Sequence, residues 1–178
     1  MEFNQIILEK LGFLFKKYNL QILEQRSNYL KLQSNSLIII IAHNQLENSN
    51  TLWLGRNDEK TDKVEIDNTT LKLFFKSDLK LSQISIEYFV DKLALFFENE
   101  AKSLLMGDGN RIDDLEKFDL ERSRKYTQDL LDRQNLAAAD RAWDTGNYKG
   151  FIKLIDQTNK DKLPSSYQLK YKIANQKA

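Results

Sequence analysis

The sequence has no cysteine among its 178 residues and a single histidine, His43. The missing cysteine excludes disulfides, thiolate catalysis and cysteine-bound metals. One histidine leaves no second imidazole to complete a metal site, so we expect neither a metal nor another cofactor. The single proline and six glycines impose few turns, which is typical of a helix-rich chain.

The chain also has little net charge and no long apolar segment. Its formal charge of +1 gives no overall attraction to nucleic acid or to an anionic membrane. The most apolar run, Leu37–Ala42, is much shorter than the roughly 20 residues that span a bilayer. The start, Met1–Asn4, lacks the basic and apolar parts of a signal peptide. We therefore expect a cytoplasmic protein that does not contact a membrane.

The run Leu37–Ala42 is rich in β-branched side chains, which predicts a central strand covered on both faces. Alternating apolar residues predict further strands at Leu20–Ile22, Leu30–Leu32 and Thr51–Gly55. The short polar connections between them favour an antiparallel meander. Val64–Ile66 is a candidate edge strand, so we expect four to five strands.

Two amphipathic helices are expected to flank this sheet. Apolar residues at helical spacing predict an N-terminal helix at about Asn4–Lys17, in which Gly12 marks a close approach to the sheet. A long central helix is predicted over Ile86–Leu104, with Ser82 or Ser85 as its N-cap.

Helix ends and one ambiguous segment complete the first hundred residues. Asn19 and Gly107 stand where a left-handed residue would end each helix. Leu71–Phe75 fits either a short strand or a helical turn capped by Asn68–Thr69. The strand is the preferred interpretation of the two.

The composition changes after Gly107, where a charged segment with a thin apolar stripe begins. We therefore expect an α+β sheet domain at residues 1–107 and an α-helical subdomain at residues 108–178. The helices predicted in this subdomain are Arg111–Gln134, Leu136–Asp144, Asn147–Asp156 and Ser165–Gln176.

The helical subdomain contains AWDTGNY at residues 142–148, followed by FIKLI at 151–155. This stretch resembles the centre of a tetratricopeptide repeat. That family has an aromatic residue ending one helix, a glycine at the corner, and a tyrosine and a small residue opening the next helix. Gly150 stands at the position of the small residue. The resemblance implies one helical hairpin rather than a superhelical array, because stable arrays usually need about three repeats.

The first hundred residues contain LGF at 11–13 and LQI at 20–22, followed by alternating strands. The order of helix, four-stranded meander and long helix resembles two groups of small bacterial proteins. One group is the immunity proteins of polymorphic and contact-dependent toxins, and the other has the secretion-chaperone-like fold. Both resemblances imply a domain that binds a partner polypeptide.

Two segments could be chemical sites, but for each we favour a structural role. His43 follows the central strand and could present an imidazole for acid–base chemistry. We favour a strand-end residue with a partly solvated ring, because no second histidine or cysteine can pair with it. Asp108, Asp113 and Asp114 resemble a calcium loop in part, but Ile112 interrupts the required ligand spacing. A helix-to-helix turn is the favoured interpretation there, and we expect no enzyme.

Residues 149–178 hold seven lysines and two aspartates, with tyrosines between them. Such a surface could contact phosphates, which makes a nucleic-acid-associated accessory protein the alternative function. The stretch has no arginine, the residue best suited to phosphate recognition. An ordinary solvated surface is therefore the favoured interpretation.

The function expected from the sequence is non-enzymatic protein binding, with a toxin-neutralising immunity protein as its most specific form. Such a protein would cover the active site of a toxin domain. The partner surface would combine the polar loops at 45–50 and 56–63 with the helical corner at 143–148. The candidate partner-binding residues are Arg56, Asp58, Trp143, Tyr148, Lys149 and Lys153. The sequence leaves the oligomeric state open.

Overall fold

The computed structural model describes residues 2–58 and 60–178. The chain divides into two compact units, residues 1–119 and residues 120–178. This boundary lies beyond the expected one at residue 107, because Ile112 and Leu115 are buried in the core of the first unit.

In the described part of the first unit, five strands form one antiparallel sheet in sequential order. The strands are β1 (Gln21–Arg26), β2 (Tyr29–Gln33), β3 (Leu37–Asn44), β4 (Ser49–Arg56) and β5 (Val64–Glu65). The predicted α+β class and the antiparallel meander are therefore confirmed. The short polar turns explain the sequential order, because hairpin connections keep consecutive strands adjacent.

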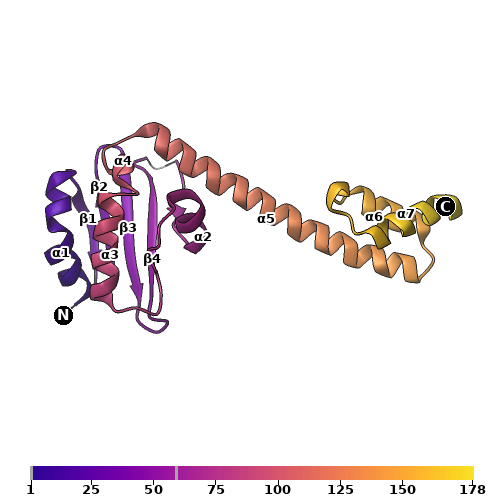
Figure 1. Ribbon diagram of the computed structural model, residues 1–178, viewed down its shortest axis with the longest axis horizontal. Helices are drawn as coiled ribbons and strands as arrows, with labels where there is room; N and C mark the ends of the chain where they lie inside the picture. The colour runs from indigo at the N-terminus through magenta and orange to yellow at the C-terminus, as the bar shows by residue number, and fades with distance from the viewer. Residues whose placement is uncertain (1, 59) are drawn as a thin grey trace. The chain divides into compact units, whose positions relative to one another are not determined.

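Two helices, α1 (Phe3–Lys17) and α3 (Ile86–Glu98), lie side by side across one face of this sheet (Figure 1). Nζ of Lys10 lies 2.6 Å from Oδ1 of Asp91, and Nζ of Lys17 lies 3.6 Å from Oε1 of Glu98. Such surface ion pairs contribute little stability. The packing of apolar side chains beneath the two helices must therefore hold this layer in place.

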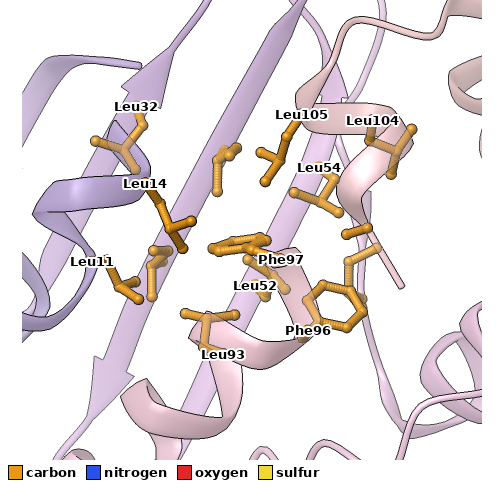
Figure 2. Close-up of a cluster of buried hydrophobic side chains, with 14 of the residues drawn as sticks. Leu11, Leu14, Leu32, Leu52, Leu54, Leu93, Phe96, Phe97, Leu104 and Leu105 are labelled. Atoms are coloured by element: carbon orange, nitrogen blue, oxygen red, sulfur yellow. The ribbon is translucent and has the colours of Figure 1, made fainter. Parts of the chain in front are cut away.

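The core of the first unit lies between these helices and the sheet (Figure 2). Each of its central side chains is at most 1% exposed, and burial of one large apolar side chain contributes roughly 1.5–3 kcal/mol before entropy is counted. These side chains are Leu11 and Leu14 of α1, Leu32, Leu52 and Leu54 of the sheet, and Leu93, Phe96 and Phe97 of α3.

The central strand β3 is covered on both faces only in part. Leu37, Ile39 and Ile41 are buried in the core, and Ile38 on the other side is 4% exposed, whereas Ile40 and Ala42 on that side are half-buried. A continuous apolar run does not reveal which of its side chains a neighbouring layer will cover. In this unit, α1 and α3 supply a layer for one face.

The expected long central helix is broken into two, so a single helix over residues 86–104 is wrong. α3 begins after Ser85, whose hydroxyl accepts a hydrogen bond from the amide of Tyr88. It ends at Asn99, whose side-chain amide donates to the carbonyl of Leu95 at 2.8 Å. After a turn, α4 (Lys102–Leu105) packs onto the core, and Gly107 follows with a φ of 83°.

The ambiguous segment at residues 71–75 is helical, so the preference for a strand is wrong. α2 (Asn68–Thr70) leads directly into the π-helical turn η1 (Leu71–Phe75). The side chain of Asp67 caps this segment by accepting a hydrogen bond from the amide of Thr70 at 2.7 Å. The ring of Phe75 packs edge-on against Phe96, with 4.9 Å between centroids. This tertiary contact favours the helical form over the strand.

The second unit consists of helices around a small core. α5 (Gly109–Asp144) begins in the first unit, and it is followed by α6 (Tyr148–Asp156), the 3-10 turn η2 (Lys160–Lys162) and α7 (Ser165–Lys177). The helices predicted at 111–134 and 136–144 are thus one helix. The buried side chains of the second core are Ala139, Phe151, Ile155 and Ala174.

Two helical glycines differ in the space around them. A Cβ at Gly12 would meet no atom within 4 Å, so the expected close approach to the sheet is wrong. A Cβ at Gly150 would lie 2.5 Å from Nδ2 of Asn147. The Asn147 side chain caps α6 by accepting a hydrogen bond from the amide of residue 150 at 2.9 Å.

These surroundings predict opposite effects of the same substitution. Gly12→Ala should stabilise the first unit by up to about 1 kcal/mol, because alanine loses less backbone entropy in a helix. Gly150→Ala should destabilise the second unit by about 1 kcal/mol, because it displaces the Asn147 cap. Urea unfolding, with hydrogen exchange recorded for each unit, measures both changes. Two effects of the same sign would contradict the structure.

Candidate protein-binding surface

A row of side chains crosses the sheet on the face opposite to α1 and α3. The strand register pairs Lys31 with Ile40, Ile40 with Trp53, and Trp53 with Glu65. Ile40 and Trp53 are half-buried, and their strand neighbours on either side point into the core instead. The row therefore has an apolar centre between a basic end and an acidic end.

Neighbouring rows extend this surface along the strands. They pair Ile38 with Gln33 and Gly55, and Ala42 with Tyr29 and Thr51. No helix among the described residues of the first unit covers this side, because those helices pack on the core side. We call it the open sheet face, and it consists of Tyr29, Lys31, Gln33, Ile40, Ala42, Thr51, Trp53 and Glu65. At one end this side of the sheet is covered, because Ile38 is only 4% exposed and Lys63 of the loop after β4 lies against Gly55. Apolar centres with polar rims are typical of protein-binding surfaces.

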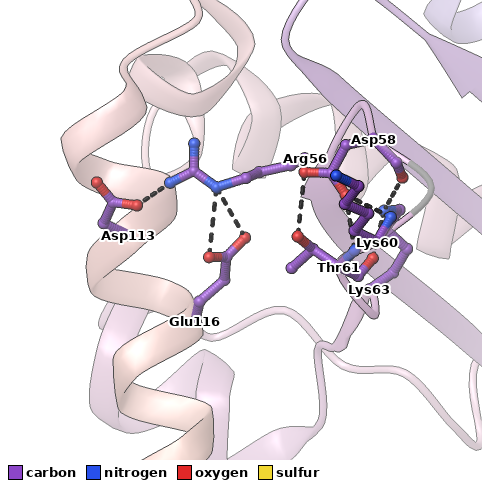
Figure 3. A network of polar contacts seen from close by, with 7 residues as sticks. All are labelled: Arg56, Asp58, Lys60, Thr61, Lys63, Asp113 and Glu116. Carbon is purple, nitrogen blue, oxygen red and sulfur yellow. Dashed lines mark hydrogen bonds and ion pairs between the residues drawn. The ribbon is translucent and has the colours of Figure 1, made fainter.

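The loop after β4 borders the open sheet face, and Asp58 holds its shape (Figure 3). Oδ1 of Asp58 accepts hydrogen bonds from the amides of Lys60 and Thr61, at 3.1 and 2.7 Å. The bond from the Thr61 amide is the main cause that lowers the pKa of Asp58. Nζ of Lys63 donates to the main-chain oxygens of Asp58 and Thr61. Asp58 therefore orders this loop, while its side chain remains at the surface.

Between this loop and the sheet lies a surface hollow of about 630 Å³. Leu23, at its β1 end, is 55% exposed. The hollow therefore gives the open sheet face a concave end next to β1. Its sheet wall consists of Leu23, Lys31, Gln33 and Ile38, and its loop wall of Asn57, Asp58, Thr61, Asp62 and Lys63.

Arg56, the other predicted partner-binding residue of the first unit, makes its contacts within that unit (Figure 3). Its guanidinium forms ion pairs with Asp113 and Glu116 of α5, with 3.3 Å between Nε and Oε1 of Glu116. Its side chain is 33% exposed. Arg56 therefore joins the start of α5 to β4, and a contact with a partner would have to compete with these ion pairs.

Trp143 and Tyr148 meet at the corner between α5 and α6. They belong to the second unit, whereas Arg56 and Asp58 belong to the first. The Trp143 ring packs edge-on against the rings of Tyr148 and Phe151, with centroids 5.5 and 5.3 Å away. Nζ of Lys170 lies 5.5 Å from the centroid of Trp143. Both predicted aromatic residues thus serve chiefly to pack the second unit.

The basic stretch at residues 149–178 is partly neutralised within the second unit. Lys149 and Lys153 are exposed on α6 and form no ion pair among the described residues. Three other lysines are paired, at distances of 2.7 to 3.0 Å: Lys160 with Asp156, Lys162 with Asp129, and Lys170 with Asp140. This pairing reduces the charge available to attract phosphates.

A hydrogen bond between Tyr167 and Asp140 makes the stability of the second unit depend on pH. The Tyr167 hydroxyl lies 2.5 Å from Oδ2 of Asp140. The bond raises the pKa of Tyr167 to about 12 and lowers the pKa of Asp140. Stability should therefore fall as the pH rises from the ordinary tyrosine value of 10.0 towards 12, and as it drops below the ordinary aspartate value of 3.8.

Tyr167→Phe should reduce both the alkaline and the acid loss of stability, because the hydrogen bond between the Tyr167 hydroxyl and Asp140 is the main cause of both pKa shifts. Part of the alkaline loss should remain, because Lys160 and Lys162 of the same unit also have raised pKa values. Urea unfolding at a series of pH values, followed by Trp143 fluorescence in a Trp53→Phe background, measures the effect. A pH profile identical to that of the parent would contradict this assignment.

His43 lies in the core, so the expected partly solvated ring is wrong. Its ring stacks on Phe3 at 5.6 Å between centroids, and its Nδ1 lies 3.0 Å from Oδ1 of Asn50. Nδ2 of Asn50 in turn donates to the carbonyl of Leu81 at 3.1 Å. The imidazole therefore helps to join β3, β4 and the segment before α3.

The acidic segment after Gly107 begins a helix. Oδ1 of Asp108 accepts hydrogen bonds from the amides of Asn110 and Arg111, at 3.1 and 3.3 Å, and so caps α5. Within residues 2–58 and 60–178, no three histidine, aspartate or glutamate side chains gather closely enough to hold a metal ion. Over the same range, no helix has both the length and the apolar character needed to cross a bilayer.

Sequence reasoning missed the row Lys31, Ile40, Trp53 and Glu65 as a binding surface. Alternation along β2 and β4 does place Lys31 and Trp53 away from the core. The apolar run of β3 hid the outward position of Ile40. The position of Glu65 depends on the pairing of β4 with β5, which no local pattern reveals.

Comparisons with known proteins give no relative from which a function could be transferred. Only the geometry and the chemistry of the chain therefore bear on its function. The chain matches no protein-family model, no curated protein and no solved structure.

Proposed function

We propose that the chain is a non-enzymatic protein-binding module and that the open sheet face is its main binding surface. One observation carries the proposal: Ile40 and Trp53 stand half-buried between Lys31 and Glu65, on a sheet face that no helix among the described residues of the first unit covers. A tryptophan at an apolar centre with a charged rim is typical of a binding hot spot. A sheet also loses little conformational entropy on binding.

Two other features argue against the competing classes of function. The imidazole of His43 is buried and hydrogen-bonded to Asn50, which argues against acid–base catalysis through it. The paired lysines Lys160, Lys162 and Lys170 argue against a nucleic-acid-binding face in the second unit. Lys149 and Lys153 remain candidates for a contact with an acidic protein surface.

The most specific form of the proposal is an immunity protein that covers the active site of a cognate toxin. The helix–meander–helix order of the first unit and its preformed binding face support this form. Occlusion requires shape and charge complementarity and no chemistry. A standard interface buries about 800 Å² on each partner, so the loop after β4 and its hollow would have to join the open sheet face in the contact.

Co-purification tests the proposal. The chain is produced together with the product of the adjacent reading frame, and the affinity of any complex is measured by calorimetry at two salt concentrations. Growth of cells that express this product, with and without the chain, measures neutralisation. A tight complex that persists in salt and protects growth supports an immunity protein. Binding to nucleic acid that falls steeply with salt, without a protein complex, would contradict it.

A further inference from the structure

We propose that two copies of the chain associate face to face through their open sheet faces. The two-fold axis would run parallel to the strands, between β3 and β4, and would place β3 of one copy over β4 of the other. This inference goes beyond the proposed function, although it concerns the same surface and would make self-association a regulator of it. A second copy and a protein partner would compete for the open sheet face.

The cross-strand row is self-complementary under this symmetry. The register sets the order Lys31, Ile40, Trp53, Glu65, and the two-fold axis reverses that order in the facing copy. Lys31 therefore faces Glu65 of the second copy, while Ile40 faces its Trp53. Neither Lys31 nor Glu65 forms an ion pair within its own chain among the described residues, so both charges remain for this contact.

The loop after β4 lies on one side of the row in each copy. Its residues Asn57, Asp58, Thr61, Asp62 and Lys63 line the hollow of their own chain, over β1, β2 and Ile38 of β3. The two-fold axis places this side of one copy opposite the β4 and β5 side of the other, so the two loops flank the row of facing side chains.

The size of the face limits how tightly two copies bind. Strands lie about 4.8 Å apart and rise about 3.4 Å per residue, so the row and its neighbours cover roughly 20 Å by 20 Å. Two such faces together with the loops bury on the order of 1,000 Å², near the lower limit of specific interfaces. We therefore expect a dimer in exchange with its monomer, which a tighter partner would displace.

An exchange of charges between copies tests the dimer. Lys31 and Glu65 lie on strands that are about 14 Å apart, too far for an ion pair within one chain. Lys31→Glu and Glu65→Lys should each prevent association, because each variant alone places like charges opposite one another twice. A mixture of the two single variants should associate again, because every facing pair then has opposite charges.

Sedimentation velocity on the full chain, over a range of concentrations, measures this result. The unaltered chain and the control Lys16→Glu, on the exposed side of α1, should change from monomer to dimer as the concentration rises. Circular dichroism confirms that each variant is folded. An unaltered chain that stays monomeric, or a mixture that fails to recover the dimer, would overturn the inference.

The same samples separate this inference from the proposed function. A monomeric chain that still binds the product of the adjacent reading frame overturns the dimer alone. A dimer that recovers in the mixture, with no protein partner, supports the self-association and contradicts the proposed function.

Discussion

Trp53→Ala is expected to weaken the binding of a protein partner by about 2–4 kcal/mol, or roughly 30- to 900-fold in Kd. Trp53 is paired with Ile40 in the strand register and is half-buried at the centre of the open sheet face, where a partner would remove its ring from water. Calorimetric titration of the purified partner measures the loss. Trp53→Phe should lose less, because a smaller aromatic ring still fills part of the contact.

Tyr88→Ala is the matched control for this prediction. Tyr88 is an aromatic residue of α3 that is 48% exposed. Helix α3 packs on the other face of the sheet, so Tyr88 lies away from the open sheet face. Its removal should leave the affinity unchanged. An equal loss of affinity in both variants, or no loss in Trp53→Ala, would place the partner elsewhere and contradict the open sheet face as the binding surface.

Phe97→Ala is expected to destabilise the first unit by about 3–5 kcal/mol, because it leaves a cavity in a close-packed core. Phe97 is 1% exposed, and Figure 2 shows its ring in the middle of the buried cluster, near Leu14 and Leu52. This loss is a large part of the 5–15 kcal/mol typical of a folded domain. Urea unfolding with segment-resolved hydrogen exchange measures it.

The effect of Phe97→Ala should be confined to the first unit, because the second unit has its own core around Phe151 and Ile155. Protection of residues 145–178 should therefore remain that of the parent chain. Leu95→Ala, a truncation of an exposed residue on the same helix, should change stability by less than about 0.5 kcal/mol. Simultaneous loss of protection in both units would show that they unfold as one.

The order of elements was predictable because it depends on neighbours within a few residues. Alternation predicted the strands on either side of β3, and helical spacing predicted α1, α6 and α7. Several helix ends followed from single residues with a defined local role. Asn19 and Gly107 have positive φ, and Ser85 caps α3 through its hydroxyl, as the sequence indicated.

The errors have a common physical cause, which is competition between local preference and packing. Phe75 is held in a helical turn by its contact with Phe96, although the segment is compatible with a strand. The apolar stripe at residues 86–104 is divided because a turn after Asn99 lets Leu104 and Leu105 reach the core. Neither outcome can be derived from spacing alone.

The candidate site depended even more on long-range structure. Arg56 and Asp58 were singled out as partner contacts, but Arg56 is held by Asp113 and Glu116, and Asp58 orders its own loop. Residues from four strands had to be brought into register before Lys31, Ile40, Trp53 and Glu65 formed one row. A shift of one residue in any pairing would turn those side chains to the other face.

The sequence by itself determined the α+β class, the antiparallel meander, the helical C-terminal region and the chemistry that missing cysteines exclude. These properties follow from composition and from contacts that are local in the chain. The tertiary structure alone decided which face of the sheet is left without a helix in the first unit and which lysines are neutralised. Both depend on side chains far apart in sequence, because burial and ion pairing are settled only when the layers pack together.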